Sequence, residues 1–280
     1  MTDAQFTISG FGDEIADDPA EQLDVLAELD IHHLDLRGAW GRNVLDLDAD
    51  DVARLKNVLA ERGARVAVIA SPVGKSQIGE SASVELERLD RAIRMAHAFE
   101  TPLIRMFSFY HEGIAHADCR DEIVSRLGAW ASRAEAAGVT LILENEGDLW
   151  GDTPERVRDL LSSVNSPALR FTLDAGNFAG LGVASYDEAY GTLKPWLHHI
   201  QIKDAIREPK QIVPAGQGEG QIPELLAAAR RDGYRGYLSL EPHLAVAGKA
   251  GGFSGAGLFG TAAQALRAIL ADLEAAEAAT

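Results

Sequence analysis

The chain is poor in cysteine, in long apolar runs and in positive charge, and each shortage excludes a class of protein. Its single cysteine, Cys119, excludes a disulfide framework and a zinc site built from cysteines. No apolar run approaches the length of about 18 residues that a membrane-spanning helix needs. The formal charge of −17 disfavours nucleic acid and anionic membranes as partners, because phosphate groups bind basic surfaces.

The first ten residues, MTDAQFTISG, lack the basic and apolar parts of a signal peptide, so we expect a cytoplasmic protein. Hydrophobic residues make up 46% of the 280 residues, which is enough for one large core. They are concentrated in eight short runs separated by longer amphipathic stretches. This alternation predicts parallel strands joined by crossover helices. The predicted strands span residues 6–11, 32–37, 65–70, 102–107, 139–144, 168–174, 198–203 and 236–241.

An open doubly wound sheet is the alternative fold, but it usually carries a glycine-rich nucleotide-binding turn after its first strand, which this chain lacks. We therefore predict an α/β fold, a closed (β/α)8 TIM barrel, as one domain spanning residues 1–280. A glycine-rich stretch at 248–260 follows the eighth strand, and we expect it to form a mobile loop over the mouth of the barrel. The predicted helices span residues 19–29, 50–62, 82–99, 121–137, 154–163, 222–232 and 261–275.

Four polar residues end four successive strands: Glu144, Asp174, Gln201 and Glu241. In a parallel barrel the carboxyl ends of all strands meet on one face, so these side chains should converge. Buried carboxylates are costly unless they are paired or bind a metal ion. Three carboxylates and one amide oxygen therefore predict a site for one divalent cation.

The alternative interpretation of these carboxylates is a network of ion pairs. Lys203 follows Gln201 at the end of the seventh strand, and Arg37 and Arg105 end the second and fourth strands, so all three cations can reach the same face. In that case the acidic side chains would be balanced by the chain's own cations.

Six motifs give the chain a resemblance to a known superfamily: FGDEIA (11–16), ENEGD (144–148), LDAGNF (173–178), HIQIKD (199–204), GEG (218–220) and SLEPH (239–243). With them it resembles the sugar phosphate isomerase/epimerase superfamily, with its xylose isomerase-like TIM barrel, over nearly its whole length. The resemblance implies a metal site at Glu144, Asp174 and Glu241. Relatives carry a histidine at the position of Gln201. The amide makes the ligand set all oxygen, which favours Mn²⁺, with Mg²⁺, Co²⁺ and Zn²⁺ as other candidates.

The resemblance also implies a reaction. A metal ion that holds a carbonyl and the adjacent hydroxyl acidifies the neighbouring C–H bond, and Glu144 and Glu241 then exchange the proton. The expected function is a metal-dependent isomerase or epimerase of a sugar or related polyhydroxy carbonyl compound. A lyase or dehydratase acting on a keto-sugar or keto-inositol is one alternative, and a non-catalytic sugar-binding or partner subunit is another. The expected partner is a small-molecule sugar or sugar derivative; a homo-oligomer is left open.

Four further residues are candidates for substrate binding: Arg37, Arg105, Lys203 and His243. The two arginines suit a carboxylate or a phosphate, with an ion pair at the barrel rim as the alternative for each. Lys203 suits a substrate oxygen, with a pairing to Glu241 or Asp174 as its alternative. GEG precedes the predicted helix at 222–232 and either exposes backbone N–H groups to an anion or forms a simple turn.

Overall fold

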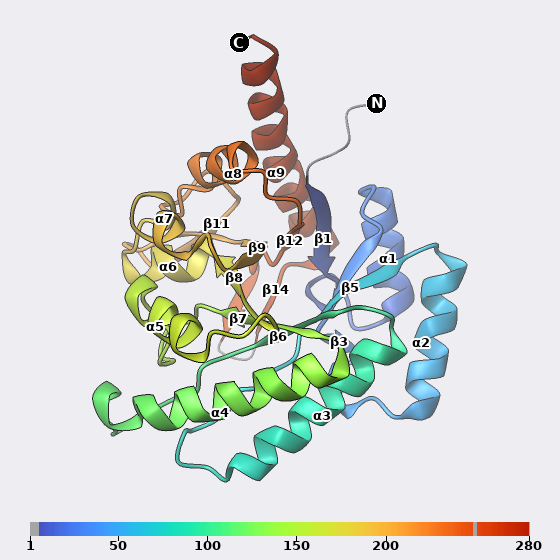
Figure 1. Cartoon of the computed structure of the whole chain (residues 1–280). Helices are drawn as coiled ribbons and strands as arrows, with labels where there is room; N and C mark the ends of the chain where they lie inside the picture. Colours follow the sequence, from blue (N-terminus) through green and yellow to red (C-terminus); the bar gives the residue numbers. More distant parts are fainter. Residues whose placement is uncertain (1–5, 249–250, 280) are drawn as a thin grey trace.

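The computed structural model describes residues 6–248 and 251–279. Eight parallel strands close into a barrel, in the order β1-β12-β9-β8-β7-β6-β5-β2, so the prediction of a (β/α)8 barrel is confirmed (Figure 1). The barrel strands are β1 (Thr7–Phe11), β2 (His33–Leu36), β5 (Arg65–Ile69), β6 (Leu103–Met106), β7 (Thr140–Glu144), β8 (Leu169–Asp174), β9 (Leu197–Ile202) and β12 (Tyr237–Leu240).

Helices surround the barrel, and their apolar faces pack on its outer surface. Two predicted starts and stops have the expected local chemistry: Asp18 caps α1 by accepting from the N–H of Ala20, and Gly138 ends α4 in the left-handed conformation that glycine tolerates. The helices are α1 (Pro19–Glu28), α2 (Ala49–Glu61), α3 (Ala82–Ala98), α4 (His116–Ala137), α5 (Pro154–Val164), α6 (Ala175–Leu181), α7 (Gly191–Leu193), α8 (Ile222–Arg231) and α9 (Gly255–Ala278).

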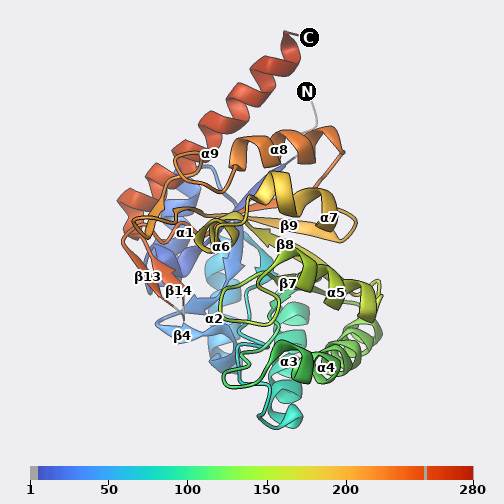
Figure 2. The same ribbon diagram turned by 90° about the vertical axis from the view of Figure 1, so that its left-hand side faces the viewer.

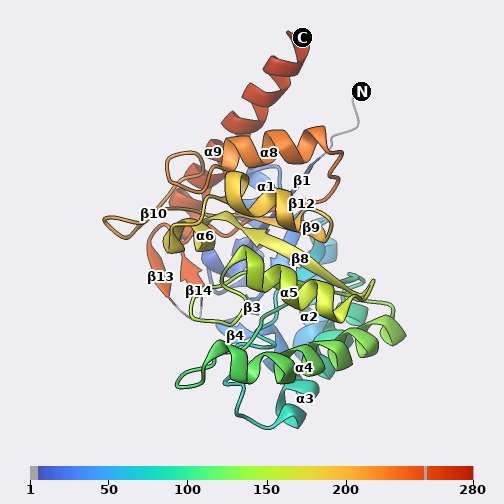
Figure 3. The same cartoon turned by 60° about the vertical axis from the view of Figure 1, so that its left-hand side comes forward.

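Three short hairpins follow barrel strands at their carboxyl ends: β3 (Gly38–Ala39) with β4 (Arg42–Asn43), β10 (Asp204–Ile206) with β11 (Gln211–Val213), and β13 (Val246–Gly248) with β14 (Gly251–Phe253). Single helical turns are η1 (Gly12–Glu14), η2 (Val44–Asp46) and η3 (Ser185–Tyr190). Figures 2 and 3 show the hairpins gathered at one end of the barrel, away from the two termini. Two of them, β10–β11 and β13–β14, border the cavity above the strand ends, where a TIM barrel carries its active site.

Two sequence predictions need correction. Helix α6 was missed, because its seven residues are too few for a helical period to stand out. The glycine-rich stretch at 248–260 is not one loop: residues 251–253 form β14, and α9 begins at Gly255. Residues 249–250 of that stretch lie outside the described part of the chain. None of the described helices is both long and apolar enough to cross a membrane.

Several buried polar side chains lie inside the barrel below the strand ends. Asp35 accepts hydrogen bonds from the hydroxyl groups of Ser9 and Ser239, and it is fully enclosed. His199 lies beside this group, and its Nδ1 is 2.7 Å from the hydroxyl oxygen of Thr172. Burial lowers the pKa of His199 to about 3, so the ring is neutral. His199 therefore packs deep in the barrel, below the positions of the strand-end carboxylates.

Candidate active site

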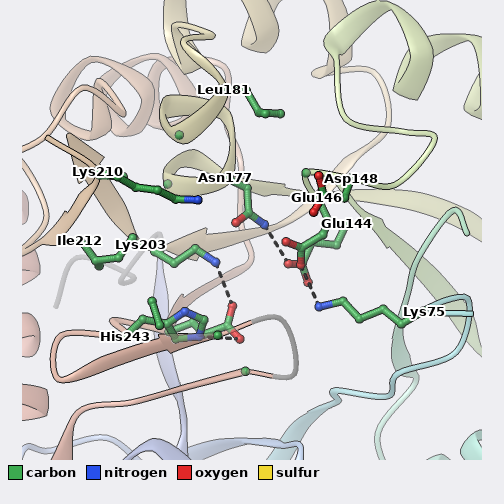
Figure 4. Close-up of a pocket in the computed structure, with 18 of the residues that line it drawn as sticks. Lys75, Glu144, Glu146, Asp148, Asn177, Leu181, Lys203, Lys210, Ile212 and His243 are labelled. Carbon is green, nitrogen blue, oxygen red and sulfur yellow. Dashed lines mark hydrogen bonds and ion pairs between the residues drawn. The ribbon is translucent and has the colours of Figure 1, made fainter. Parts of the chain in front are cut away.

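A cavity of about 350 Å³ opens at the carboxyl ends of the strands. Its floor is formed by Glu144, Glu241 and Lys203, and its walls by loops and by the hairpins β10–β11 and β13–β14. Figure 4 shows Lys203 and Asn177 directed into this space from one side and Lys75 from the other. The volume lies in the range of small-molecule sites, at the small end of about 300–1,000 Å³.

Three carboxylates converge on the floor of the cavity. Glu144 ends β7, Asp174 ends β8, and Glu241 follows β12. One oxygen of each lies within 4.8 Å of the others, and all three residues are buried. Neighbouring strands set this geometry, because Asp174 pairs in register with Gln201 on β9, and Gln201 pairs with Ser239 on β12.

Each carboxylate also has a cationic neighbour, so the contacts of the ion-pair alternative are present. Arg105 Nη1 lies 3.2 Å from Glu144 Oε2. Lys203 Nζ lies 2.7 Å from Asp174 Oδ2 and 3.6 Å from Glu241 Oε2. Each carboxylate oxygen has two lone pairs, so these contacts and a bound cation do not exclude each other.

Arg37 and Arg105 are held in place by aromatic rings as well as by charge. The guanidinium groups of both lie over the ring of Phe11, at 5.0 and 5.2 Å from its centroid. Arg37 Nε donates to Asp13 Oδ2 at 2.8 Å, and its Nη1 donates to Glu241 Oε1 at 2.8 Å. Both arginines line the cavity, but their groups facing Glu144 and Glu241 are already engaged.

Gln201 lies among the carboxylates. Its Nε2 donates to Glu144 Oε2 at 3.0 Å, while its Oε1 is buried without a hydrogen-bond partner among the described residues. A buried amide oxygen without a partner costs free energy of about 1–3 kcal/mol. The unpartnered oxygen is therefore available to bind a cation beside the acidic group.

Helix α6 supplies Asn177, which sequence analysis did not select. Its Nδ2 donates to Glu144 Oε1 at 3.2 Å, and its backbone N–H donates to Asp174 Oδ1 at 2.8 Å. Asp174 is therefore the N-cap of α6, since it ends a strand and accepts an N–H from three residues later. Asn177 thus fixes the orientation of two of the three carboxylates.

Asp204, the last residue of the motif HIQIKD, holds the loop that carries the motif GEG. Its carboxylate accepts hydrogen bonds from the backbone N–H groups of Gly216, Gly218 and Gly220, at 2.9–3.0 Å. A Cβ atom at Gly218 would lie 2.3 Å from Asp204 Oδ1, so this approach requires glycine. The anion bound by the glycine N–H groups is therefore the chain's own carboxylate, and it anchors β10–β11 beside Lys203.

His243 reaches back toward the end of β1. Its Nε2 lies 3.2 Å from Glu14 Oε1 and 3.4 Å from Glu241 Oε1. Glu14 is completely buried, and burial raises its pKa to about 8. The motif FGDEIA offers Asp13 and Glu14 as groups that orient substrate hydroxyls, with a helix cap as the alternative for Asp13. It gives no signal for the contact between Glu14 and His243.

Burial and neighbouring charges shift the pKa values of the three carboxylates in different directions. Burial raises the pKa of Asp174 to about 7 even though Lys203 opposes the shift, and burial likewise raises the pKa of Glu144. For Glu241, burial is outweighed by Lys203 and His243, which hold its pKa well below the usual range. Lys203 itself is buried among these acids, and they raise its pKa. Environments that separate the protonation of neighbouring acids are typical of acid–base catalysts.

Comparison with known proteins places this geometry in a family. The profile of the xylose isomerase-like TIM barrel family matches residues 23–269. The chain belongs to this family. Its members share the barrel, and the expected resemblance to the superfamily is confirmed.

Two curated relatives of this family member are enzymes. It is 29% identical over 198 residues to a 2-epi-5-epi-valiolone 7-phosphate 2-epimerase of an Actinoplanes species, a match covering 69% of this chain and 70% of that one. It is 23% identical over 201 residues to a 3-dehydroshikimate dehydratase of Bacillus anthracis, covering 68% and 70%.

A solved structure shows the same fold. A xylose isomerase-like TIM barrel protein of Mycobacterium smegmatis, in complex with magnesium, superimposes with a TM-score of 0.75 at 17% identity, over 96% of this chain and 98% of that one. The relatives are thus an epimerase and a dehydratase, and one protein of the same fold binds a divalent cation.

Proposed function

We propose that the protein is a divalent-metal-dependent isomerase or epimerase of a sugar or related polyhydroxy carbonyl compound. The observation that carries the proposal is the buried group of Glu144, Asp174 and Glu241, whose oxygens lie within 4.8 Å of one another on the cavity floor. Three buried carboxylates at strand ends suit a divalent cation, and the epimerase among the relatives supports the reaction type.

Four residues would hold the metal ion: Glu144, Asp174, Gln201 and Glu241. The unpartnered Oε1 of Gln201 fits this role, because a cation would supply the partner that this buried oxygen lacks. An all-oxygen ligand set suits Mn²⁺ or Mg²⁺ better than Zn²⁺, and we propose Mn²⁺. When bound, the ion acts as a Lewis acid that polarises the substrate carbonyl and acidifies the adjacent C–H.

The protein's own residues move the proton. Strands β8 and β9 separate Glu144 from Glu241 around the barrel, so the two carboxylates approach a substrate in the cavity from different sides. One accepts the proton from the carbon next to the carbonyl, and the other returns a proton to complete the inversion or isomerisation. We assign the binding of substrate oxygens to Arg37, Arg105, Lys203 and His243, which all line the cavity.

Solvent-isotope exchange tests this proposal. In D₂O with added Mn²⁺, a panel of keto-sugars, free and phosphorylated, should take up deuterium at the carbon next to the carbonyl. Glu144→Gln and Glu241→Gln should each lower turnover roughly 10²-fold or more, since the amide cannot accept a proton. Glu122→Gln, which removes an exposed carboxylate paired with Arg126, is the matched control. Turnover without exchange would indicate a hydride shift and would leave both glutamates as ligands only.

A dehydratase is the second candidate, because a relative with 23% identity is a 3-dehydroshikimate dehydratase. The same carboxylates would remove the proton, and a hydroxyl on the next carbon would then leave as water. Mass spectrometry of the products separates the two functions. Epimers keep the mass of the substrate, whereas dehydration gives a product lighter by one water molecule.

A further inference from the structure

A second group of potential ligand atoms lies beside the first. It consists of Glu14, Glu241 and His243, all buried, with one ligand atom of each within 4.8 Å of the others. Glu14 follows β1 and His243 follows β12, and these strands are neighbours because the barrel closes between them. Figure 4 shows the ring of His243 at the base of the cavity.

Two of the potential metal-ligand atoms in this group lack hydrogen-bond partners among the described residues. Glu14 Oε2 accepts hydrogen bonds from the His243 backbone N–H and the Ser254 hydroxyl, both at 2.9 Å. Glu14 Oε1 has no such partner, and neither does His243 Nε2. The carboxylate is therefore fixed by one oxygen, while the other faces the imidazole nitrogen 3.2 Å away.

Two of the three spacings in this group match the coordination of a tetrahedral metal ion, and the ligand atoms of Glu14 and Glu241 lie within 4.8 Å of each other. Two ligands at about 2.0–2.1 Å from Zn²⁺, separated by a tetrahedral angle, lie about 3.3–3.4 Å apart. His243 Nε2 lies 3.2 Å from Glu14 Oε1 and 3.4 Å from Glu241 Oε1. The ring is also held in position, since a Cβ at Gly252 would come within 2.0 Å of it. Fixed ligands of this kind lower the cost of ordering a metal site.

We propose that Glu14, His243 and Glu241 bind a second divalent cation, of the Zn²⁺ or Co²⁺ type, with a water molecule as the fourth ligand. Glu241 would then belong to both cation sites, and in this respect the proposal rests on the proposed function. Three protein ligands and one water molecule are the arrangement of catalytic zinc sites that keep an open position. The nitrogen ligand distinguishes this site from the all-oxygen site proposed for Mn²⁺.

Local charge is compatible with a cation in this position. Arg37 Nη1 donates to Glu241 Oε1 at 2.8 Å, and Arg105 Nη1 lies 3.6 Å from the same oxygen. Both cations are shared with other acids, Arg37 with Asp13 and Arg105 with Glu144. Among the described residues, the only ion pair of Glu14 is with His243. A carboxylate oxygen has a second lone pair, so Glu241 Oε1 can accept from Arg37 and still bind a metal ion.

Metal stoichiometry tests the proposal. Metal-free wild type and three variants, Glu14→Gln, Asp174→Asn and the double variant, are dialysed against micromolar Co²⁺ and then subjected to elemental analysis. Ions bound elsewhere, for example at the surface pair His111 and His116, are common to all four proteins, so only differences count. We expect each single variant to bind one ion fewer per chain than wild type, and the double variant two fewer.

The visible absorption of Co²⁺ reports four-coordinate geometry, and a His243 variant tests the nitrogen ligand. His243→Gln should lose the intense bands of four-coordinate Co²⁺, as should Glu14→Gln, whereas Asp174→Asn should keep them. The proposal is wrong if Glu14→Gln and His243→Gln bind as much Co²⁺ as wild type, with an unchanged spectrum. If instead Asp174→Asn changes nothing while Glu14→Gln loses an ion, the second site stands and the metal centre of the proposed function fails. Thermal unfolding of each metal-free variant shows whether it is folded.

Discussion

Replacing Lys203 with methionine tests how far the site depends on its own cations. The Lys203 ammonium is 5% exposed and lies 2.7 Å from Asp174 Oδ2 and 3.6 Å from Glu241 Oε2. Removing one partner of a buried ion pair leaves an uncompensated charge and typically costs about 3–5 kcal/mol. For a chain of this length, about 2 °C per kcal/mol gives a fall in melting temperature of about 6–10 °C.

The loss should depend on pH, because burial raises the pKa of Asp174 to about 7. Below that pH Asp174 is partly protonated and needs no partner, so the variant should lose less stability at pH 6 than at pH 8. Mn²⁺ should stabilise the variant more than it stabilises wild type, because the ion is no longer repelled by the ammonium group beside Asp174. A tenfold gain in affinity corresponds to about 1.4 kcal/mol at saturating metal.

The assay is thermal unfolding at both pH values, once with chelator and once with about 1 mM Mn²⁺, a concentration high enough to occupy a weak metal site. Lys194→Met is the matched control, since its ion pair with Asp232 is half exposed and should be worth less than about 1 kcal/mol. If Lys203→Met and wild type have the same melting temperature under all conditions, Lys203 does not compensate the charge of the acidic group.

Three further predictions address neighbouring residues. Gln201→His should keep a metal ion but shift the preference toward Zn²⁺ or Co²⁺, measured by competitive dialysis; an unchanged preference would show that Gln201 is not a ligand. Asp204→Asn should destabilise the protein by about 2–4 kcal/mol in chemical unfolding, because part of the charge-assisted bonding to the glycine N–H groups is lost; no loss would contradict its role as the anchor of β10–β11. Glu14→Gln in chelator should flatten the pH dependence of stability. Burial raises the pKa of Glu14 and so favours its protonated form in the folded state. The contribution of this protonated form to stability is complete below the ordinary pKa of 4.5 and is lost as the pH rises through about 8. Identical pH profiles of stability for the variant and wild type would show that Glu14 does not have a raised pKa.

The positions of the acidic residues could be predicted from the sequence for a physical reason. Strands of a parallel barrel recur at a nearly constant spacing, and their carboxyl ends meet on one face, so residues such as Glu144 and Asp174 must converge. The barrel order then follows from chain order and closure. The ion pairs were foreseen only as an alternative to the metal site, yet the structure contains them beside the converging carboxylates.

Other features were not readable, because they depend on contacts beyond the strand ends. Glu14 and His243 are 229 residues apart in the chain and meet only because the first and last strands are neighbours in the barrel. The sequence pattern of a loop is not periodic, so it does not predict which residues the loop's side chains contact. Asn177 lies in a helix of seven residues, too short for an amphipathic pattern. The hairpin β13–β14 formed where glycine content predicted only a loop.

In the proposed reaction, a divalent cation and the carboxylates of Glu144 and Glu241 together move a proton next to a carbonyl. The most direct measurement follows deuterium uptake from D₂O into keto-sugars by one protein sample, first treated with chelator and then supplied with Mn²⁺. The account predicts that exchange stops when elemental analysis shows the metal to be removed, and returns on Mn²⁺ addition in wild type but not in Asp174→Asn. Exchange that continues unchanged in the metal-free protein would contradict it.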